Sequence, residues 1–133
     1  MTDPAQVVRE VLDLHTWAVV GLRQNPARPA YGVAQFLQQQ GKRVVPVHRT
    51  PQDVFGEQAY PQLADIPHPV DVVDVFVNST LAGDVADQAV AIGARAVWFQ
   101  LGVIDEAAFE RTTAAGVPMV MDTCPAIEWR NRR

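Results

Sequence analysis

The segment WAVVGLRQNPARPAYGVAQFLQQQGKRVVPV, residues 17–47, decides the fold. Residues 17–20 are an unbroken apolar run that ends at Gly21, which is typical of a strand covered on both faces. After a proline-containing loop comes a helix of about ten residues, which ends at Gly41. A glycine is common at this position because the residue after a helix often takes a left-handed backbone conformation. Residues 44–47 form the next strand. Because Pro46 lacks an N–H, we expect pairing to be incomplete near its end.

The rest of the chain repeats this alternation of strands and helices. The further strands are expected at residues 70–77, 96–99 and 117–121, with a short edge strand at residues 58–60. A first helix is expected to be capped by Thr2 or Asp3, with Pro4 at its first position. Later helices are expected from Ser79 or Thr80 to Ile92, from Asp105 to Ala115, and, as a short helix, after Pro125. Such alternation with short loops predicts an α/β fold, in which helices cover both faces of a parallel sheet.

Length and composition predict one ordinary globular domain, residues 1–133, with a core at about 14–130. Hydrophobic residues make up 48% of the 133 residues and charged residues 20%. A net charge of -4 gives no electrostatic case for binding nucleic acid or an anionic membrane. The start lacks the pattern of a signal peptide, and no apolar run approaches the roughly 18 residues of a membrane span. We therefore expect a cytoplasmic protein; the sequence does not indicate its oligomeric state.

The topology predicts a ligand site before any motif is considered. In open parallel sheets the ligand lies outside the carboxyl ends of the strands, where strand order reverses. The segments there are residues 21–31, 47–51, 77–80 and 100–104. Residues 21–31 lead into the N-terminus of a helix near Ala30 and Tyr31, where free N–H groups can bind a pyrophosphate. Arg23 and Arg28 in this loop either hold phosphate or are exposed loop arginines.

The end of the second strand narrows the choice of ligand. The first loop lacks the GxGxxG pattern of dinucleotide sites, since Gly21 is followed by Leu22 and Arg23. An NAD site expects a carboxylate after the second strand, whereas this chain has His48 and Arg49. Basic groups there indicate a ribose phosphate, which both NADP and coenzyme A (CoA) carry. The alternative is that the pair forms an ordinary solvated turn.

Seven segments, taken in order, resemble the stand-alone CoA-binding domain family, which is related to the CoA-binding domain of the succinyl-CoA synthetase alpha subunit. They are WAVVG (17–21), NPARPAY (25–31), RVVPV (43–47), GEQAYPQLADIP (56–67), PVDVVDVF (69–76), AIGARAVWFQLGV (91–103) and VPMVMDTCPAIEWR (117–130). The resemblance implies a Rossmann-like sheet of order 3-2-1-4-5-6, with the Tyr60 segment as its short edge strand. It also implies CoA or an acyl-CoA as the ligand.

The resemblance also implies roles for individual residues. It brings Gly21, Leu22, Arg23 and Arg28 to the phosphates, Val47, His48 and Arg49 to the adenosine end, and Val77 and Asn78 to the ribose or pantetheine. The chain departs from the family where Gly-Ala-Ser is usual, because it has Gly21-Leu22-Arg23. It also has Ala30 in place of a serine before the helix, so two phosphate-binding hydroxyls are lost. Either Arg23 replaces them or affinity is reduced.

We identify no catalytic set and no metal site. His15, His48 and His68 are scattered over different loops, and a single cysteine, Cys124, excludes an internal disulfide. Asp71 and Asp74 lie an odd number of residues apart in one strand, so they point to opposite faces of the sheet. We expect a non-catalytic CoA-binding protein. The alternatives are an NADP-binding oxidoreductase fragment and a detached module of an ADP-forming acyl-CoA synthetase.

Overall fold

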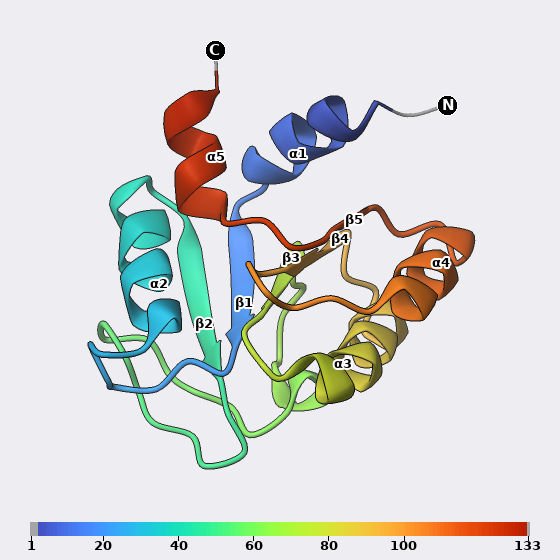
Figure 1. Ribbon diagram of the computed structural model, residues 1–133. Helices are drawn as coiled ribbons and strands as arrows, with labels where there is room; N and C mark the ends of the chain where they lie inside the picture. Colours follow the sequence, from blue (N-terminus) through green and yellow to red (C-terminus); the bar gives the residue numbers. More distant parts are fainter. Residues whose placement is uncertain (1–2, 133) are drawn as a thin grey trace.

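The computed structural model describes residues 3–132 (Figure 1). The helices are α1 (Pro4–Leu12), α2 (Pro29–Gln39), α3 (Ser79–Ala91), α4 (Glu106–Ala114) and α5 (Pro125–Asn131), with one 3-10 turn, η1 (Leu63–Asp65). The strands are β1 (Thr16–Val20), β2 (Arg43–Val47), β3 (Val72–Val75), β4 (Ala96–Phe99) and β5 (Met119–Val120). No helix among the described residues is long and apolar enough to cross a membrane.

All five strands run parallel, in the order β2-β1-β3-β4-β5. Beyond β2 the sheet is extended only by a single parallel bridge between Val47 and Tyr60. When the Tyr60 segment is counted as the third strand along the chain, this is the expected order 3-2-1-4-5-6. The Rossmann-like α/β fold is therefore confirmed, although residues 58–60 form one bridge where a short strand was expected.

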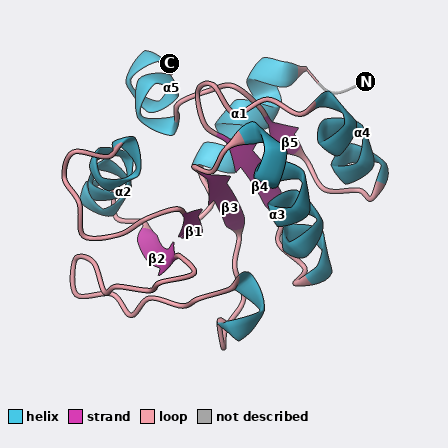
Figure 2. Ribbon diagram, turned by 60° about the horizontal axis from the view of Figure 1, so that its bottom comes forward, coloured by secondary structure: helices cyan, strands magenta, loops and turns pink. Residues whose placement is uncertain are grey.

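Helices cover both faces of the sheet, as the alternation predicted (Figures 1 and 2). On one face, α1, α2 and α5 pack over Trp17, Val19 and Trp98, and the two tryptophan rings lie 5.7 Å apart between centroids. On the other face, alanines of α3 and α4 pack over Val73 and Val97. Small side chains let those helices approach the sheet closely, so two apolar layers bury the central strands.

The helix starts follow the expected capping chemistry, with one correction. The Asp3 carboxylate accepts a hydrogen bond from the Ala5 amide at 3.2 Å, and that of Asp105 accepts one from the Ala108 amide at 3.0 Å. The expected cap of α3 by Ser79 or Thr80 is wrong. Asn78 caps this helix and accepts from the Thr80 amide at 2.9 Å. Asparagine caps as well as serine does, and here it comes first along the chain.

Pro46 does not interrupt the pairing of β2 with β1, contrary to expectation. The register continues through Val20 and Val47. Val47 accepts a hydrogen bond from the Gly21 amide, whereas the carbonyl of Pro46 accepts one from Tyr60 on the outer side. Backbone groups of alternate residues point to opposite neighbours in a parallel strand, so the missing N–H of Pro46 falls on the sparsely paired edge.

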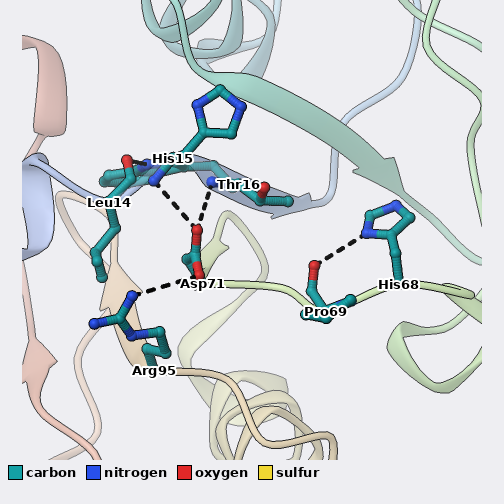
Figure 3. Close-up of polar contacts among 8 residues, drawn as sticks. Leu14, His15, Thr16, His68, Pro69, Asp71 and Arg95 are labelled. Carbon is teal, nitrogen blue, oxygen red and sulfur yellow. Dashed lines mark hydrogen bonds and ion pairs between the residues drawn. The ribbon is translucent and has the colours of Figure 1, made fainter.

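Two strands are shorter than expected. Residues 70–77 contribute β3 over Val72–Val75, and residues 117–121 contribute only the two residues of β5. Just before β3, the Asp71 carboxylate accepts hydrogen bonds from the amides of His15 and Thr16 at the start of β1, at 3.3 and 2.9 Å (Figure 3). The same carboxylate lies 3.9 Å from the Arg95 guanidinium. Asp71 is therefore a structural residue that joins the amino ends of neighbouring strands.

Candidate ligand cleft

Gly21 marks the point where the chain leaves β1 toward one face of the sheet and leaves the adjacent β3 toward the other. Its φ is +102°, and a Cβ there would lie 3.0 Å from the carbonyl oxygen of Phe76. The Gly21 amide donates to Val47 at 2.8 Å, and the Phe76 amide donates to Val20 at 2.9 Å. A side chain at this position would separate the two strand ends. Glycine therefore keeps the switch point of the sheet tight and open to solvent.

Three adjoining clefts meet at the carboxyl ends of the strands, and all three share Gly21 and Arg28. The main cleft, about 440 Å³, is lined by Val20, Gly21, Arg28, Val47, His48, Arg49, Pro61, Gln62, Leu63, Phe76, Val77, Asn78, Leu81, Val85 and Gln88. The basic cleft, about 440 Å³, is lined by Gly21, Arg23, Gln24, Asn25, Arg28, His48 and Gln52. The inner cleft, about 310 Å³, is lined by Gly21, Arg28, Pro29, Ala30, Phe76, Gln100, Leu101 and Val103.

The loop between β1 and α2 holds its arginines outward. Leu22 is fully buried in the core, which anchors the loop next to exposed Arg23. The Asn25 side chain accepts from the Ala27 amide at 3.1 Å, and the Gln24 amide donates to Gln52 at 2.9 Å. These local bonds give the loop a defined shape without using either arginine. Arg28 lines all three clefts and Arg23 lines the basic cleft, and neither side chain forms an ion pair with a described residue.

The start of α2 has a different kind of cap from those of α1, α3 and α4. Its N-cap is Arg28, which makes no side-chain hydrogen bond to the first turn, and Pro29 follows it. An arginine side chain has no acceptor, so it cannot satisfy the free N–H groups of a helix start. Pro29 has no N–H, and the Tyr31 amide donates to the Arg28 carbonyl at 3.1 Å. The Ala30 amide and the positive end of the helix dipole therefore remain available to an anion beside the Arg28 side chain.

His48 lies at the centre of the positive charge. Partial burial, followed by the charges of Arg23, Arg49 and Arg28, lowers the pKa of its imidazole below the ordinary value. Its Nδ1 atom lies 3.1 Å from the Thr50 amide and 3.0 Å from Thr50 Oγ1. The amide donates to Nδ1, which leaves the other ring nitrogen as the N–H donor of the neutral imidazole. The cleft thus gathers four basic side chains from two loops.

Most residues proposed from the sequence line these clefts. They are Gly21, Arg23, Arg28, Ala30, Val47, His48, Arg49, Val77 and Asn78. Two lie elsewhere: the Leu22 side chain belongs to the core, and the Tyr31 ring packs on Phe55 at 4.8 Å between centroids. Leu22 can therefore meet a ligand only through its backbone.

Sequence reasoning missed other lining residues. Leu63 comes from the 3-10 turn, and Leu81 and Gln88 come from α3. Gln52 and Leu63 lie in the segment between β2 and β3, which is loop apart from the turn η1 (Figure 2). The sequence of this segment has no helical or strand periodicity. Gln100 was within reach, because it begins one of the four segments expected at the carboxyl edge. Its polar side chain after an apolar strand was the available signal.

No acidic residue or cysteine is among the described residues that line the clefts. The Asp74 carboxyl is fully buried, and no described residue forms a hydrogen bond with it. The Cys124 side chain is buried as well. Within residues 3–132, no three His, Cys, Asp or Glu side chains gather into a group that could hold a metal ion. The clefts therefore offer cationic, amide and apolar groups.

Fold and site together define a Rossmann-like α/β domain with a basic cleft at its topological switch point. The chain belongs to the CoA binding domain family, whose family model matches residues 15–130. The resemblance identified in the sequence is thus confirmed.

Similar proteins agree with this assignment. The uncharacterized protein YneT of Bacillus subtilis is 33% identical over 107 residues, which are 80% of this chain and 79% of YneT. A structure of a hypothetical protein from Pyrococcus horikoshii is 33% identical, with a TM-score of 0.90 over 98% of this chain and 91% of that one. The structure of cell-free ID.343 from Thermus thermophilus is 34% identical, with a TM-score of 0.88 over 98% of each chain.

A larger protein shares the fold. The dinucleotide forming acetyl-coenzyme A synthetase 1 of Ca. Korarchaeum cryptofilum is 21% identical, with a TM-score of 0.72 over 86% of this chain. This chain covers only 28% of that synthetase. At this identity the likeness concerns the fold alone.

Proposed function

We propose that this protein binds CoA or an acyl-CoA across the three clefts and does not itself catalyse a reaction. The observation that carries the proposal is the gathering of Arg23, Arg28, His48 and Arg49 around Gly21, without any lining carboxylate to neutralise them. CoA carries three phosphate groups, two in its pyrophosphate and one on its ribose. In a member of the CoA binding domain family, this charge pattern favours CoA over an uncharged ligand.

The geometry suggests where each phosphate binds. The pyrophosphate lies over Gly21 at the start of α2, where Arg28 supplies a bidentate guanidinium. The 3′-phosphate lies beside His48 and Arg49, which follow β2 directly. This arrangement leaves Val77 and Asn78, which also line the main cleft, for the ribose or the pantetheine.

The absence of catalysis is part of the proposal. No Asp, Glu, Ser or Cys is among the described lining residues of the three clefts, so the lining offers no nucleophile with a partner base. His48 has one ring nitrogen engaged with Thr50 and lies among arginines that oppose its protonation. Such a histidine suits phosphate recognition better than proton transfer.

Thermal unfolding with different ligands tests the proposal. At a hundredfold excess over Kd, linkage predicts a stabilisation of roughly 2.7 kcal/mol. For a domain of this size, that corresponds to a rise in Tm of roughly 10 °C. We expect CoA or acetyl-CoA to produce such a rise and NAD to produce none, with the CoA recovered unchanged. An equal rise with NADPH would favour an NADP-binding protein, and no rise with CoA would refute the proposal.

A further inference from the structure

The chain that follows β2 makes a loop that is closed at its base. The His48 amide donates to the Tyr60 carbonyl at 3.1 Å, which joins the two ends of the loop. Compact surface loops whose ends lie together frequently carry functional residues. The first arm of this loop, residues 48–53, brings Arg49 to the main cleft and Gln52 to the basic cleft. The shape of the loop therefore decides where these two side chains lie.

The tip of the loop, residues 54–57, is a tight turn with a strained backbone. Val54 and Glu57 exchange both backbone hydrogen bonds, at 2.9 and 3.3 Å. The two residues between them, Phe55 and Gly56, have φ values of +56° and +76°. Glycine adopts such a conformation readily, whereas a bulky side chain disfavours it. The turn therefore stays formed only if contacts elsewhere offset the strain at Phe55.

Contacts with α2 offset this strain. Val54 is fully buried in the core cluster that includes the buried face of α2. The Phe55 ring packs on Tyr31 at 4.8 Å between centroids, and the Gln38 side chain donates to the Phe55 carbonyl at 3.5 Å. Without these contacts, Phe55 would relax to an ordinary backbone conformation and the turn would open.

The docked tip also fixes the first arm. The Asp53 carboxylate, next to the tip, accepts from the Ala59 amide at 2.9 Å, which joins the two arms of the loop. The preceding Gln52 side chain accepts from the Gln24 amide at 2.9 Å, which joins the first arm to the loop between β1 and α2. No residue of the tip is among the described residues that line the three clefts. The tip therefore acts on a ligand through the first arm and not by contact.

We infer that Phe55 is a positioning residue for the ligand: docked on Tyr31, it keeps the first arm in the shape that presents Arg49 to a ribose phosphate. The inference rests on the proposed function and adds the way in which the fold holds the site in shape. When the tip leaves α2, Arg49 loses its fixed place beside the main cleft, whereas Arg28 keeps its place at the start of the helix. Selectivity for the ribose phosphate then falls, and binding through the pyrophosphate persists.

Phe55→Ala tests the inference, because it removes the ring and leaves the strain of the turn in place. We expect the ratio of CoA affinity to dephospho-CoA affinity, measured by calorimetric titration, to fall roughly tenfold, the contribution of about one hydrogen bond to a charged group. Tyr31→Ala, which removes the ring partner without changing the loop, should lower the same ratio. Phe55→Tyr keeps an aromatic ring and should retain the wild-type ratio.

Phe109→Ala is the matched control. Phe109 is also a half-buried phenylalanine, but it lies in α4, packs in the core layer on the other face of the sheet and is not among the described residues that line the clefts. Phe55→Ala and Phe109→Ala should both lower the Tm of the free protein. Only the Phe55 and Tyr31 variants should alter the affinity ratio, which a merely structural role would leave unchanged.

Hydrogen exchange gives a second readout in the wild-type protein. A ligand that binds the first arm favours the docked tip, so CoA should slow exchange of the Glu57 and Ala59 amides. These amides donate to Val54 and Asp53 within the loop, and neither Glu57 nor Ala59 is among the described residues that line the clefts. Dephospho-CoA should slow their exchange less than CoA does.

The outcomes separate the inference from the function beneath it. An unchanged affinity ratio in both the Phe55→Ala and the Tyr31→Ala variants overturns the inference alone. Exchange at Glu57 and Ala59 that does not respond to bound CoA also overturns it. Failure of the wild type to bind CoA at all refutes the proposed function, and the inference with it.

Discussion

His48 couples the charge of the cleft to pH. Burial and the neighbouring arginines hold its pKa below the ordinary value of about 6.5, so the free protein keeps the imidazole neutral near pH 7. A bound phosphate would favour the charged form and raise this pKa. Binding therefore takes up a proton in the pH range near and below 6.5, and His48 strengthens binding as the pH falls.

The His48→Gln variant tests this coupling. The ratio of wild-type to variant CoA affinity should increase between about pH 8 and about pH 6, as measured by calorimetry. Protonation of the free ligand affects both titrations equally, so the ratio reports the interaction between His48 and the bound phosphate. A ratio that is the same at both pH values would show that no phosphate approaches this imidazole.

Arg28 is the basic residue shared by all three clefts. Arg28→Ala should weaken CoA by roughly 1.5–3 kcal/mol, because a hydrogen bond to a charged group is lost. The Tm of the free protein should change little, since an exposed arginine contributes little to folding. Arg43→Ala is the control: it removes the same charge from an exposed site at the start of β2. Equal losses in both variants would point to general electrostatics instead of a specific contact.

The buried Asp74 carboxyl destabilises the folded protein when it is ionised. Burial raises the pKa of its carboxyl well above the usual value. Because this pKa is higher in the folded state, the contribution of the group to stability is fully present below about pH 3.9 and is lost as the pH rises through the folded pKa. The free energy of unfolding thus falls by up to roughly 1.4 kcal/mol per pH unit within that window.

Asp74→Asn removes this titration. The variant should gain stability relative to the wild type as the pH rises above about 4. Urea unfolding between about pH 4 and about pH 7 measures the difference, with Asp84→Asn, an exposed carboxylate of α3, as the control. A constant difference over this range would mean that the Asp74 carboxyl titrates alike in the folded and unfolded states.

Two glycines in neighbouring elements have opposite roles. Gly21 has a positive φ and lies against Phe76, so Gly21→Ala should destabilise the fold by roughly 1–3 kcal/mol. Gly32 lies within α2, and a Cβ added there would meet no atom within 4 Å, so Gly32→Ala should stabilise the fold by about 0.5–1 kcal/mol. Thermal unfolding measures both. The same sign of effect in the two variants would contradict this view of the switch point.

At the scale of elements, the sequence predicted the order of strands and helices but not their lengths. Apolar runs mark buried strands, and capping residues mark helix starts, so the alternation was visible. The apolar run at residues 70–77 extends beyond the paired residues of β3, because Val70 is buried in the core and Val77 packs against the core from the edge of the cleft. Hydrophobicity reports burial, and burial extends further than pairing.

For the whole molecule, the position of the site could be predicted from the topology, but several of the residues that line it could not. The switch point and the basic residues followed from strand order and from local composition. Leu63 and Gln52 could not be predicted, because their positions depend on how the segment between β2 and β3 folds against the cleft. The inward direction of the Leu22 side chain likewise depends on packing against α2, which no local pattern encodes.

The 3′-phosphate tests the central claim most directly. Calorimetric titration of the wild type with CoA and dephospho-CoA should show a preference for CoA of roughly 1.5–3 kcal/mol, because His48 and Arg49 make charge-assisted contacts to that phosphate. The double variant His48→Ala, Arg49→Ala should lose most of this preference, since the cycle between ligand and protein isolates the pairwise contribution. If the wild type binds CoA and dephospho-CoA equally well, the basic pair does not recognise a ribose phosphate and the proposed binding mode is wrong.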